Sequence, residues 1–351
     1  MKTEFKYEPL SEPIPITDQI WPEGTVPLVH TRTMTFMHED YIRDCIEGIL
    51  MQKTTFPVLL LIHDDASTDK TAEIVKEYEQ KYPALIKAYY QKENSYTKID
   101  KHSRREEFMS WRIGKYEAIC EGDDYWIDPL KLQKQVTFLE ENKDYGLVGT
   151  SNKIYFEQKT IYKTHKLKEA DYSFEDFVLG NRITTLTSCF RTDLLKRYLN
   201  EIKPENKGWY SGDYPMWMYM SKKMKVKILP DITAVYRKRE ESASNTNNIH
   251  KKLFIDKYRH TIRKFYSDYF ESPTELKRKV DVRSYREAEI NALKAKDFEY
   301  CREILNSYEL NGYSGLAFFL KIYMKFPSLI DMFYFIERVF IKLNIVKTVN
   351  F

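Results

Sequence analysis

The feature that most constrains the fold of this 351-residue chain is an unbroken apolar run that stops at two acids, VLLLIHDD (58–65). Runs of this kind are typical of strands that are buried on both faces of a parallel sheet. Apolar residues recur at helical spacing before the run, at 41–50, and after it, at 67–82. Strand-like segments also lie at 28–36, 87–91 and 115–120. This alternation predicts an α/β fold with a doubly wound, mostly parallel, Rossmann-like sheet.

Three local signals mark where elements should begin or break. Ser67 or Thr68 is expected to cap the helix after the apolar run, because hydroxyl side chains accept from the free backbone N–H groups at helix starts. Asp128 and Pro129 are expected at the N-cap and the first helical position of a later helix. Pro230 is expected to break residues 224–240 into two strands.

The pattern changes after the α/β part of the chain. The C-terminal third reads as helical, and residues 285–305 predict a helical hairpin that turns near Asp297. We therefore expect a Pro-rich N-terminal arm at 1–27, an α/β domain at 28–247 and a helical region at 248–351.

Composition excludes several classes of protein. The net charge of +4 is too small to indicate nucleic-acid binding. The four cysteines are widely spaced and form no CxxC pair, so neither a zinc site nor a disulfide framework is indicated. The N-terminus lacks the apolar core of a signal peptide, and the chain has no uncharged apolar run of about 20 residues. The cytoplasm is therefore the expected location, with attachment to the inner face of the cell membrane as a possibility.

Acidic side chains follow two of the predicted strands. Asp64 and Asp65 end one strand, and EGDD (121–124) follows another. Ligands of doubly wound sheets bind beyond the carboxyl ends of the strands, so both clusters are expected at one edge of the sheet. Each cluster also has a plain alternative, which is a solvated turn whose acids favour the positive end of the next helix.

Four segments occur in an order that resembles family 2 glycosyltransferases of the GT-A fold. They are DDASTDKT (64–71), GKYEAICEGDDYWIDPLKLQKQ (114–135), GDYPMW (212–217) and AVYRKREESAS (234–244). The similar proteins are bacterial enzymes that build surface polysaccharides. The resemblance implies an inverting transfer of a hexosyl-type sugar from a nucleotide sugar, most readily a UDP-sugar, to a glycan or lipid-linked glycan. It also implies Mg²⁺ or Mn²⁺ as cofactor.

The resemblance assigns the two acidic clusters to the donor. Asp65, with Asp64 beside it, would hold the nucleotide base through charge-assisted hydrogen bonds. Glu121 and Asp123 stand at the ends of the family's Asp-x-Asp motif, and Asp124 adjoins it. Asp123 is the first expected ligand of the cation that neutralises the departing diphosphate. Asp124 and Glu121 come next, and either could instead hold the ribose or act through water.

Asp213 occupies the position of the family's catalytic base, which takes the proton from the attacking hydroxyl. Seen alone, an Asp before a helix is more often an N-cap. Tyr214 and Trp217 follow and are assigned to the acceptor side, although Trp217 could equally pack in the core.

The segment AVYRKRE resembles the part of the family that closes over the diphosphate. Tyr236 and Arg237 match it, and Arg suits bidentate contact with phosphate. Arg239 stands where many relatives carry His, so we expect it to bind phosphate and not a metal. The first strand retains Thr35 for donor contact, whereas Met37 replaces an Asn of the family.

Two other functions compete with sugar transfer. A non-catalytic nucleotide-sugar-binding or scaffolding protein of the same fold is permitted by the lost Asn and the altered metal motif, although Asp65, Asp123 and Asp213 argue against it. A nucleotidyltransferase would carry a Gly-rich phosphate loop after the first strand, and TFMHEDY (35–41) contains no glycine. The apolar stretch 315–345 could lie on a membrane surface or pack on the protein.

Overall fold

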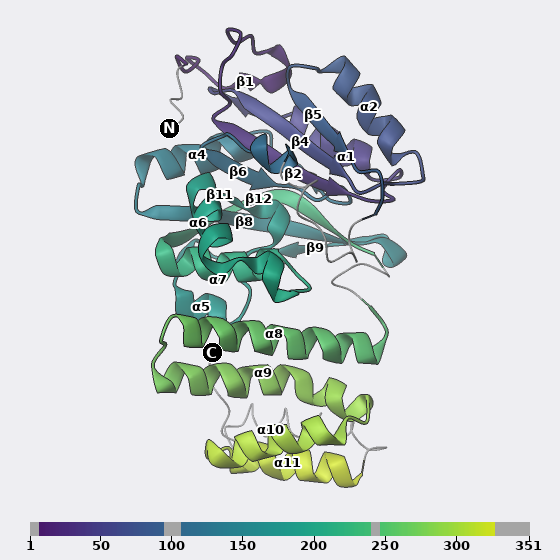
Figure 1. Ribbon diagram of the computed structural model, residues 1–351, viewed down its shortest axis with the longest axis vertical. Helices are drawn as coiled ribbons and strands as arrows, with labels where there is room; N and C mark the ends of the chain where they lie inside the picture. Colours follow the sequence, from purple (N-terminus) through teal and green to yellow (C-terminus); the bar gives the residue numbers. More distant parts are fainter. Residues whose placement is uncertain (1–6, 95–106, 240–245, 327–351) are drawn as a thin grey trace. The chain divides into compact units, whose positions relative to one another are not determined.

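The computed structural model describes residues 7–94, 107–239 and 246–326. These residues form two compact units (Figure 1). The first unit holds the described residues up to 174 and residues 182–239, and the second holds residues 175–181 and 246–326.

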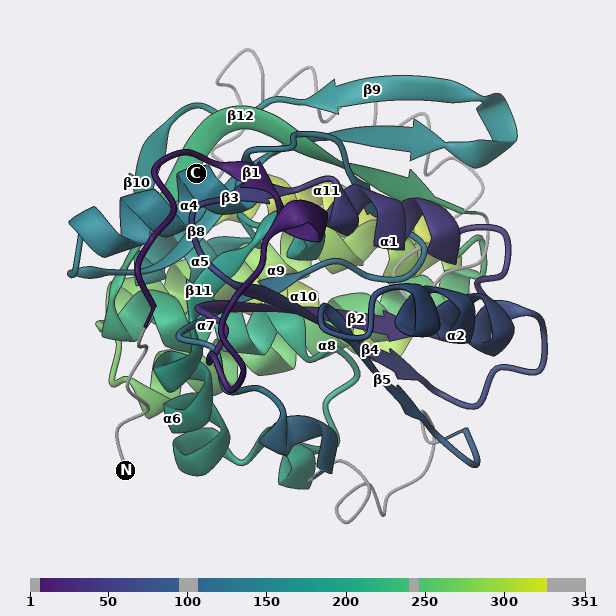
Figure 2. The same ribbon diagram turned by 90° about the horizontal axis from the view of Figure 1, so that it is seen from above.

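The first unit is built on one ten-stranded sheet (Figures 1 and 2). Its strands are β2 (Val29–Thr35), β4 (Val58–Asp64), β5 (Ile86–Tyr90), β6 (Tyr116–Ile119), β7 (Tyr125–Trp126), β8 (Tyr145–Phe156), β9 (Ile161–His165), β10 (Ala170–Tyr172), β11 (Cys189–Arg191) and β12 (Lys225–Lys238). The strand order is β10-β12-β8-β11-β6-β2-β4-β5, with β7 paired to β12 and β9 to β8. β6, β2, β4 and β5 run parallel, and so do β8 and β12, while β11 lies antiparallel between the two blocks. The expected α/β fold is confirmed, with a sheet that is rich in parallel strands.

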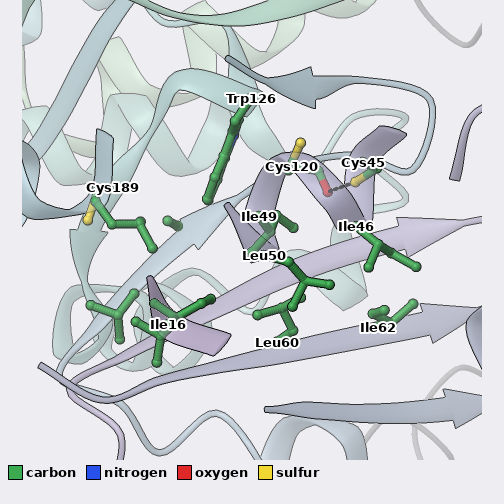
Figure 3. Packing of buried hydrophobic residues seen from close by; sticks show 14 of the residues in the cluster. Ile16, Cys45, Ile46, Ile49, Leu50, Leu60, Ile62, Cys120, Trp126 and Cys189 are labelled. Carbon is green, nitrogen blue, oxygen red and sulfur yellow. Dashed lines mark hydrogen bonds between the residues drawn. The ribbon is translucent and has the colours of Figure 1, made fainter. Parts of the chain in front are cut away.

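Helices cover this sheet and close its core. They are α1 (Ile42–Leu50), α2 (Thr71–Lys81), α4 (Lys131–Glu141), α6 (Thr192–Ile202) and α7 (Asp213–Lys223). Ile46 and Ile49 of α1 pack with Leu60 and Ile62 of β4 and with Trp126, and none of the five is more than 1% exposed (Figure 3). Residues three apart on a helix and two apart on a strand share a face, which is why these apolar positions meet.

The described part of the N-terminal arm is docked on the first unit. β1 (Ile14–Pro15) pairs antiparallel with β3 (Lys53–Thr54). The Ile16 N–H donates to the Gln52 carbonyl at 2.9 Å, and the Ile16 side chain is fully buried. This part of the arm therefore contributes to the core.

α2 begins at Thr71, and the expected cap by Ser67 or Thr68 is wrong. The Ser67 hydroxyl instead donates to Asp64 at 2.5 Å. The Thr71 N–H donates to Asp69 Oδ1 at 3.0 Å, so this later acid supplies the bond. The hydroxyl that could have capped the helix is used in the loop at the end of β4.

The other two local expectations are also corrected. α4 begins at Lys131, so Asp128 and Pro129 precede the helix. Asp128 Oδ1 accepts from the Leu130 N–H at 2.9 Å and closes a turn of its own. Pro230 does not break β12, because it falls at a shift in the pairing of β12 with β8, where a proline removes no ladder hydrogen bond.

The second unit is helical, as expected. Its helices are α8 (Ile249–Tyr269), α9 (Thr274–Lys294), α10 (Phe298–Leu310) and α11 (Ser314–Lys325), preceded by α5 (Phe174–Leu179), most of which belongs to it. α9 and α10 form the expected hairpin, and Asp297 at its turn accepts from the Tyr300 N–H at 3.1 Å.

α11 buries Leu320 and Tyr323 in the core of the second unit. Of the apolar stretch 315–345, the part after residue 326 lies outside the described residues. No helix within 7–94, 107–239 and 246–326 is long and apolar enough to cross a membrane.

Candidate functional site

The carboxyl ends of β2, β4 and β6 meet at one edge of the sheet. The strand register pairs Thr35 with Asp64, and the Asp65 N–H donates to the Thr35 carbonyl at 3.0 Å. On the other side of β2, the Gly122 N–H donates to the Met34 carbonyl at 3.0 Å. The two acidic clusters therefore flank the end of β2, as parallel strands that share an edge require.

The two acids after β4 have different surroundings. Asp64 is 2% exposed, and its oxygens accept from the Ser67 N–H at 3.1 Å and from the Ser67 hydroxyl at 2.5 Å. Asp65 is half-buried. Ala66 has a φ of 61°, in the left-handed region, and so bends the chain sharply after it. Asp64 therefore shapes the loop, and Asp65 is the acid that keeps exposed surface.

The loop after β6 is fastened to β12 by Asp124. The Asp124 N–H donates to the Glu121 carbonyl at 2.9 Å, and Asp124 Oδ1 accepts from the Arg237 N–H at 2.8 Å. Asp124 is only 3% exposed, and burial, followed by the charge of Asp123, raises the pKa of Asp124 well above its ordinary value. The bond from the Arg237 N–H makes Asp124 the anchor of this loop, and the metal role predicted for Asp124 stays a prediction.

Glu121 is half-buried and lies among other charges. Burial raises the pKa of Glu121 to about 7; the charge of Arg32 opposes the rise, and the charges of Asp123 and Asp213 add to it. The role predicted for Glu121, at the first position of the Asp-x-Asp motif, stays a prediction.

Asp123 is the acid of this loop whose surroundings suit a cation. Its side chain is 18% exposed, and Oδ2 lies 2.8 Å from Arg239 Nη2. The described residues hold no group of three or more His, Cys, Asp or Glu side chains arranged for a metal. Mg²⁺ is commonly held by one or two carboxylates, with phosphate oxygens and waters as the other ligands. Asp123 thus fits a cation that binds together with a diphosphate.

The guanidinium of Arg237 is occupied by protein groups. It pairs with Asp44, donates to the Asp123 carbonyl at 3.1 Å, and lies over the rings of Tyr125 and Tyr41 at 4.5 and 5.3 Å. These contacts pair the charge of the guanidinium and pack it against two aromatic rings. Arg237 therefore braces the acidic loop, and Arg239 is the arginine of this segment that lies beside the Asp123 carboxylate.

Asp213 is the first residue of α7, and Gly212 takes the N-cap position. The Asp213 carboxylate accepts from the Thr185 hydroxyl at 2.5 Å, from the Tyr214 N–H at 2.7 Å and from the Ser211 hydroxyl. An ionised carboxylate has about four acceptor positions. The three bonds fix its orientation and leave capacity for one more donor.

Aromatic residues assigned to the site lie mostly in the core. Trp217 has no exposed surface and packs edge-on against Phe190 of β11, with ring centroids 5.6 Å apart. Tyr214 is 6% exposed, and Tyr236 packs against the core of the first unit. Trp217 therefore packs in the core, which is the second of its two predicted places, because the face of α7 that carries it lies against the sheet.

His38 belongs to the site and was not singled out from the sequence. Its Nδ1 lies 3.2 Å from Thr35 Oγ1, and its Nε2 lies 3.2 Å from Arg239 Nη2. Burial lowers the pKa of His38, against the charge of Asp123, which raises it. The only signal in the sequence is a histidine three residues beyond the end of β2.

A buried ion cluster lies on the strands that carry the site. Glu117 of β6 is fully buried and lies 2.8 Å from His30 Nε2, and it accepts from Arg32 Nε at 3.0 Å and Arg112 Nε at 2.7 Å. Burial alone would raise the pKa of Glu117, but the charges of Arg112, His30 and Arg32 together lower it. Arg32 also acts on the pKa of Glu121, which links this cluster to the site. Its members are too far apart in sequence to form a recognisable motif.

The sequence has relatives among glycosyltransferases. A family model described as glycosyl transferase family 2 matches residues 33–201. An uncharacterized glycosyltransferase of Methanocaldococcus jannaschii is 26% identical over 216 residues, which are 60% of this chain and 71% of that protein. A Bacillus subtilis glycosyltransferase named for teichuronic acid biosynthesis is 33% identical over 115 residues, which are 33% of this chain and 43% of that protein. An uncharacterized protein of Mycobacterium tuberculosis is 42% identical over 112 residues, or 32% of this chain, and the match spans 31% of the length of that relative.

Two solved structures share the fold. Residues 1–349 of S. aureus TarS, in complex with UDP-GlcNAc, match with a TM-score of 0.50 at 16% identity, over 80% of this chain and 91% of that chain. The mannosyltransferase PcManGT from Pyrobaculum calidifontis, in complex with GDP-Man and Mn²⁺, matches with a TM-score of 0.50 at 13% identity, over 97% of this chain and 90% of that chain. At these identities the likeness concerns the GT-A fold alone. Residues 33–201 are therefore similar to family 2 glycosyltransferases, and the fold of the chain is of the GT-A type.

Proposed function

We propose that this protein transfers a sugar, with inversion, from a nucleotide sugar to a hydroxyl of a glycan or lipid-linked glycan during synthesis of a surface polysaccharide. The observation that carries the proposal is the gathering of the donor-side acids at the ends of β2, β4 and β6, with Asp213 near enough to act on Glu121. The charges of Asp123 and Asp213 both act on Glu121, so the candidate metal ligand and the candidate base lie near the same carboxyl. The names of the relatives, including the one named for teichuronic acid biosynthesis, support this class of reaction.

Donor recognition is assigned to Asp65 and Arg239. Asp65 offers a carboxylate at the end of β4, which can accept from a ring N–H of the nucleotide base. The Arg239 side chain is 21% exposed and can turn its planar fork to the diphosphate. Asp64 supports Asp65, because its bond to Ser67 holds the loop after β4. Arg237 supports Arg239 in the same segment, because its pair with Asp44 fixes the chain there. UDP-sugars are the donors that we favour, and GDP-sugars come next.

A divalent cation would be held by Asp123 together with the donor. When bound, Mg²⁺ or Mn²⁺ neutralises the negative charge that develops on the leaving diphosphate. Asp124 is assigned the role of anchoring the loop, because its carboxylate accepts from the Arg237 N–H, and Glu121 is assigned a supporting role beside Asp123.

Asp213 is proposed to accept the proton of the attacking hydroxyl. Its three hydrogen-bond donors hold the carboxylate in one orientation, with one acceptor position left for the substrate. A general base placed in this way contributes about 10²–10⁴-fold to the rate.

The test is release of nucleotide by the full chain from a panel of UDP- and GDP-sugars with Mn²⁺, with and without a chelator. Asp213→Asn should lose at least about 10²-fold of the release while donor affinity is retained. Asp193→Asn, which alters an exposed acid of α6, is the matched control and should leave both unchanged.

Other outcomes would favour the competing functions. Tight binding of a nucleotide sugar without turnover, even with cell extracts that offer acceptors, would identify a non-catalytic binding protein. Pyrophosphate formed from a nucleoside triphosphate would identify a nucleotidyltransferase. Release that persists in full with the chelator would refute the role of the cation.

A further inference from the structure

Two basic atoms converge on one nitrogen of Arg239. Arg239 Nη2 lies 2.8 Å from Asp123 Oδ2 and 3.2 Å from His38 Nε2, and these two atoms are 3.9 Å apart. A guanidinium therefore stands between a carboxylate and an imidazole. Its positive Nη2 group is thus bound by one carboxylate oxygen and one imidazole nitrogen, both of which are atoms that can also bind a metal ion.

The protonation of His38 follows from this contact. A guanidinium only donates hydrogen bonds, so His38 Nε2 must accept and carry a lone pair. The ring proton then lies on Nδ1, which donates to Thr35 Oγ1 at 3.2 Å. A histidine whose Nδ1–H is held by an oxygen and whose Nε2 lone pair points into a site has the tautomer and orientation of a metal ligand.

The backbone around His38 holds the ring in place before any ligand arrives. The His38 N–H donates to Thr71 Oγ1 at 2.8 Å, and Met37 before it has a φ of 56°, in the left-handed region. Gly122 permits the arrangement, because a Cβ there would lie 2.8 Å from His38 Nδ1 and 2.7 Å from Thr35 Oγ1. These are the features of a preorganised ligand and not of an incidental surface histidine.

We propose that His38 Nε2 and Asp123 Oδ2 are paired ligands of the divalent cation, and that Arg239 occupies the cation's place until metal and diphosphate bind. Bonds of about 2.1 Å from a cation to each atom span up to about 4.2 Å, so the separation of 3.9 Å is within reach. The identity of the cation as a partner of the donor diphosphate rests on the proposed function, whereas the metal site itself does not.

The pair also predicts which cation is preferred. Mg²⁺ is bound almost entirely by oxygen, whereas imidazole nitrogen suits transition metals. One carboxylate with one imidazole therefore favours Mn²⁺ over Mg²⁺, and loss of the imidazole should reduce that preference.

The test measures binding of Mn²⁺ alone to the full chain, from the electron paramagnetic resonance signal of free Mn²⁺, without nucleotide. His38→Ala should weaken Mn²⁺ binding at least about tenfold, and Thr35→Val, which removes the partner of Nδ1, should weaken it by a smaller factor. Arg239→Gln should tighten it, because the competing positive charge is gone. His250→Ala, at an exposed position of α8, is the matched control and should change nothing.

Mn²⁺ affinity is expected to fall in His38→Ala and to rise in Arg239→Gln. A merely structural role of His38 would not predict these opposite changes. If His38→Ala keeps its thermal midpoint and binds Mn²⁺ like the wild type, the proposal is wrong. It is also wrong if neither the wild type nor Arg239→Gln binds Mn²⁺. Mn²⁺ binding that depends on His38, without nucleotide release from any sugar nucleotide, would uphold the metal site and refute the proposed function instead.

Discussion

Removal of the charge at Glu117 is expected to cost a large part of the stability of the first unit. Glu117 is fully buried, and Arg112, Arg32 and His30 all bind its two oxygens. Glu117→Gln keeps the shape of the side chain but leaves the Arg112 guanidinium, which is itself buried, without a counter-charge. Breaking a buried pair in this way costs about 3–5 kcal/mol.

The measurement is urea unfolding of the first unit at pH 7. With a denaturant slope of about 3 kcal/mol/M, a loss of about 4 kcal/mol lowers the urea midpoint by about 1.3 M. The control is Glu77→Gln, because Glu77 forms a similar two-point contact with Arg43, at 3.2 and 2.7 Å, but on the surface. Exposed pairs contribute little, so this midpoint should not move.

The stability lost in Glu117→Gln should also depend on pH. The cluster lowers the pKa of Glu117 from its ordinary value of 4.5, so its stabilisation is complete above that value and is lost as the pH falls through the lowered pKa. The difference between wild type and Glu117→Gln should therefore shrink on acidification. Midpoints that differ by less than about 0.3 M at pH 7, or a difference that grows in acid, would refute the reasoning.

Three further substitutions probe the packing of the site and its surroundings. Gly122→Ala should cost about 1–3 kcal/mol in thermal unfolding, because its Cβ would lie 2.7 Å from Thr35 Oγ1, whereas Gly212→Ala meets no atom within 4 Å and should be tolerated. Asp124→Asn keeps an acceptor oxygen and removes a carboxyl whose pKa burial raises, so the melting temperature at pH 7 should hold or increase; a clear decrease would contradict this. Trp217→Ala should lower the free energy of unfolding in urea by about 3–5 kcal/mol, because the side chain is fully buried. An unchanged free energy of unfolding would instead favour the predicted contact of Trp217 with the acceptor.

Much of the fold could be read from local pattern. The apolar run before Asp64 and the helical spacing around it predicted the parallel block of strands, because burial on both faces leaves no polar position in a strand. The local chemistry was less reliable. Ser67 has the residue type of a helix cap, but its hydroxyl binds Asp64 instead. The N–H of Thr71, the first helical residue, donates to Asp69, which lies one residue before the N-cap Lys70.

Some residues of the candidate site could be predicted from local motifs, and others could not. Asp65, Asp123 and Asp213 were predicted from their motifs, because each stands after a strand or at the start of a helix. His38 and Glu117 were not found, since their partners come from distant parts of the chain and no spacing announces them.

The sequence alone determined the α/β architecture, the edge of the sheet at which acids collect, and the order of the motifs, because these follow from periodicity and from strand ends. Only the tertiary structure shows how the surroundings of these acids differ. Asp124 accepts from the backbone N–H of Arg237, burial raises the pKa of Glu121 to about 7, and Asp123 faces a histidine and an arginine. Burial and the charges of neighbours cause these differences, and both depend on residues that meet only when the sheet is assembled.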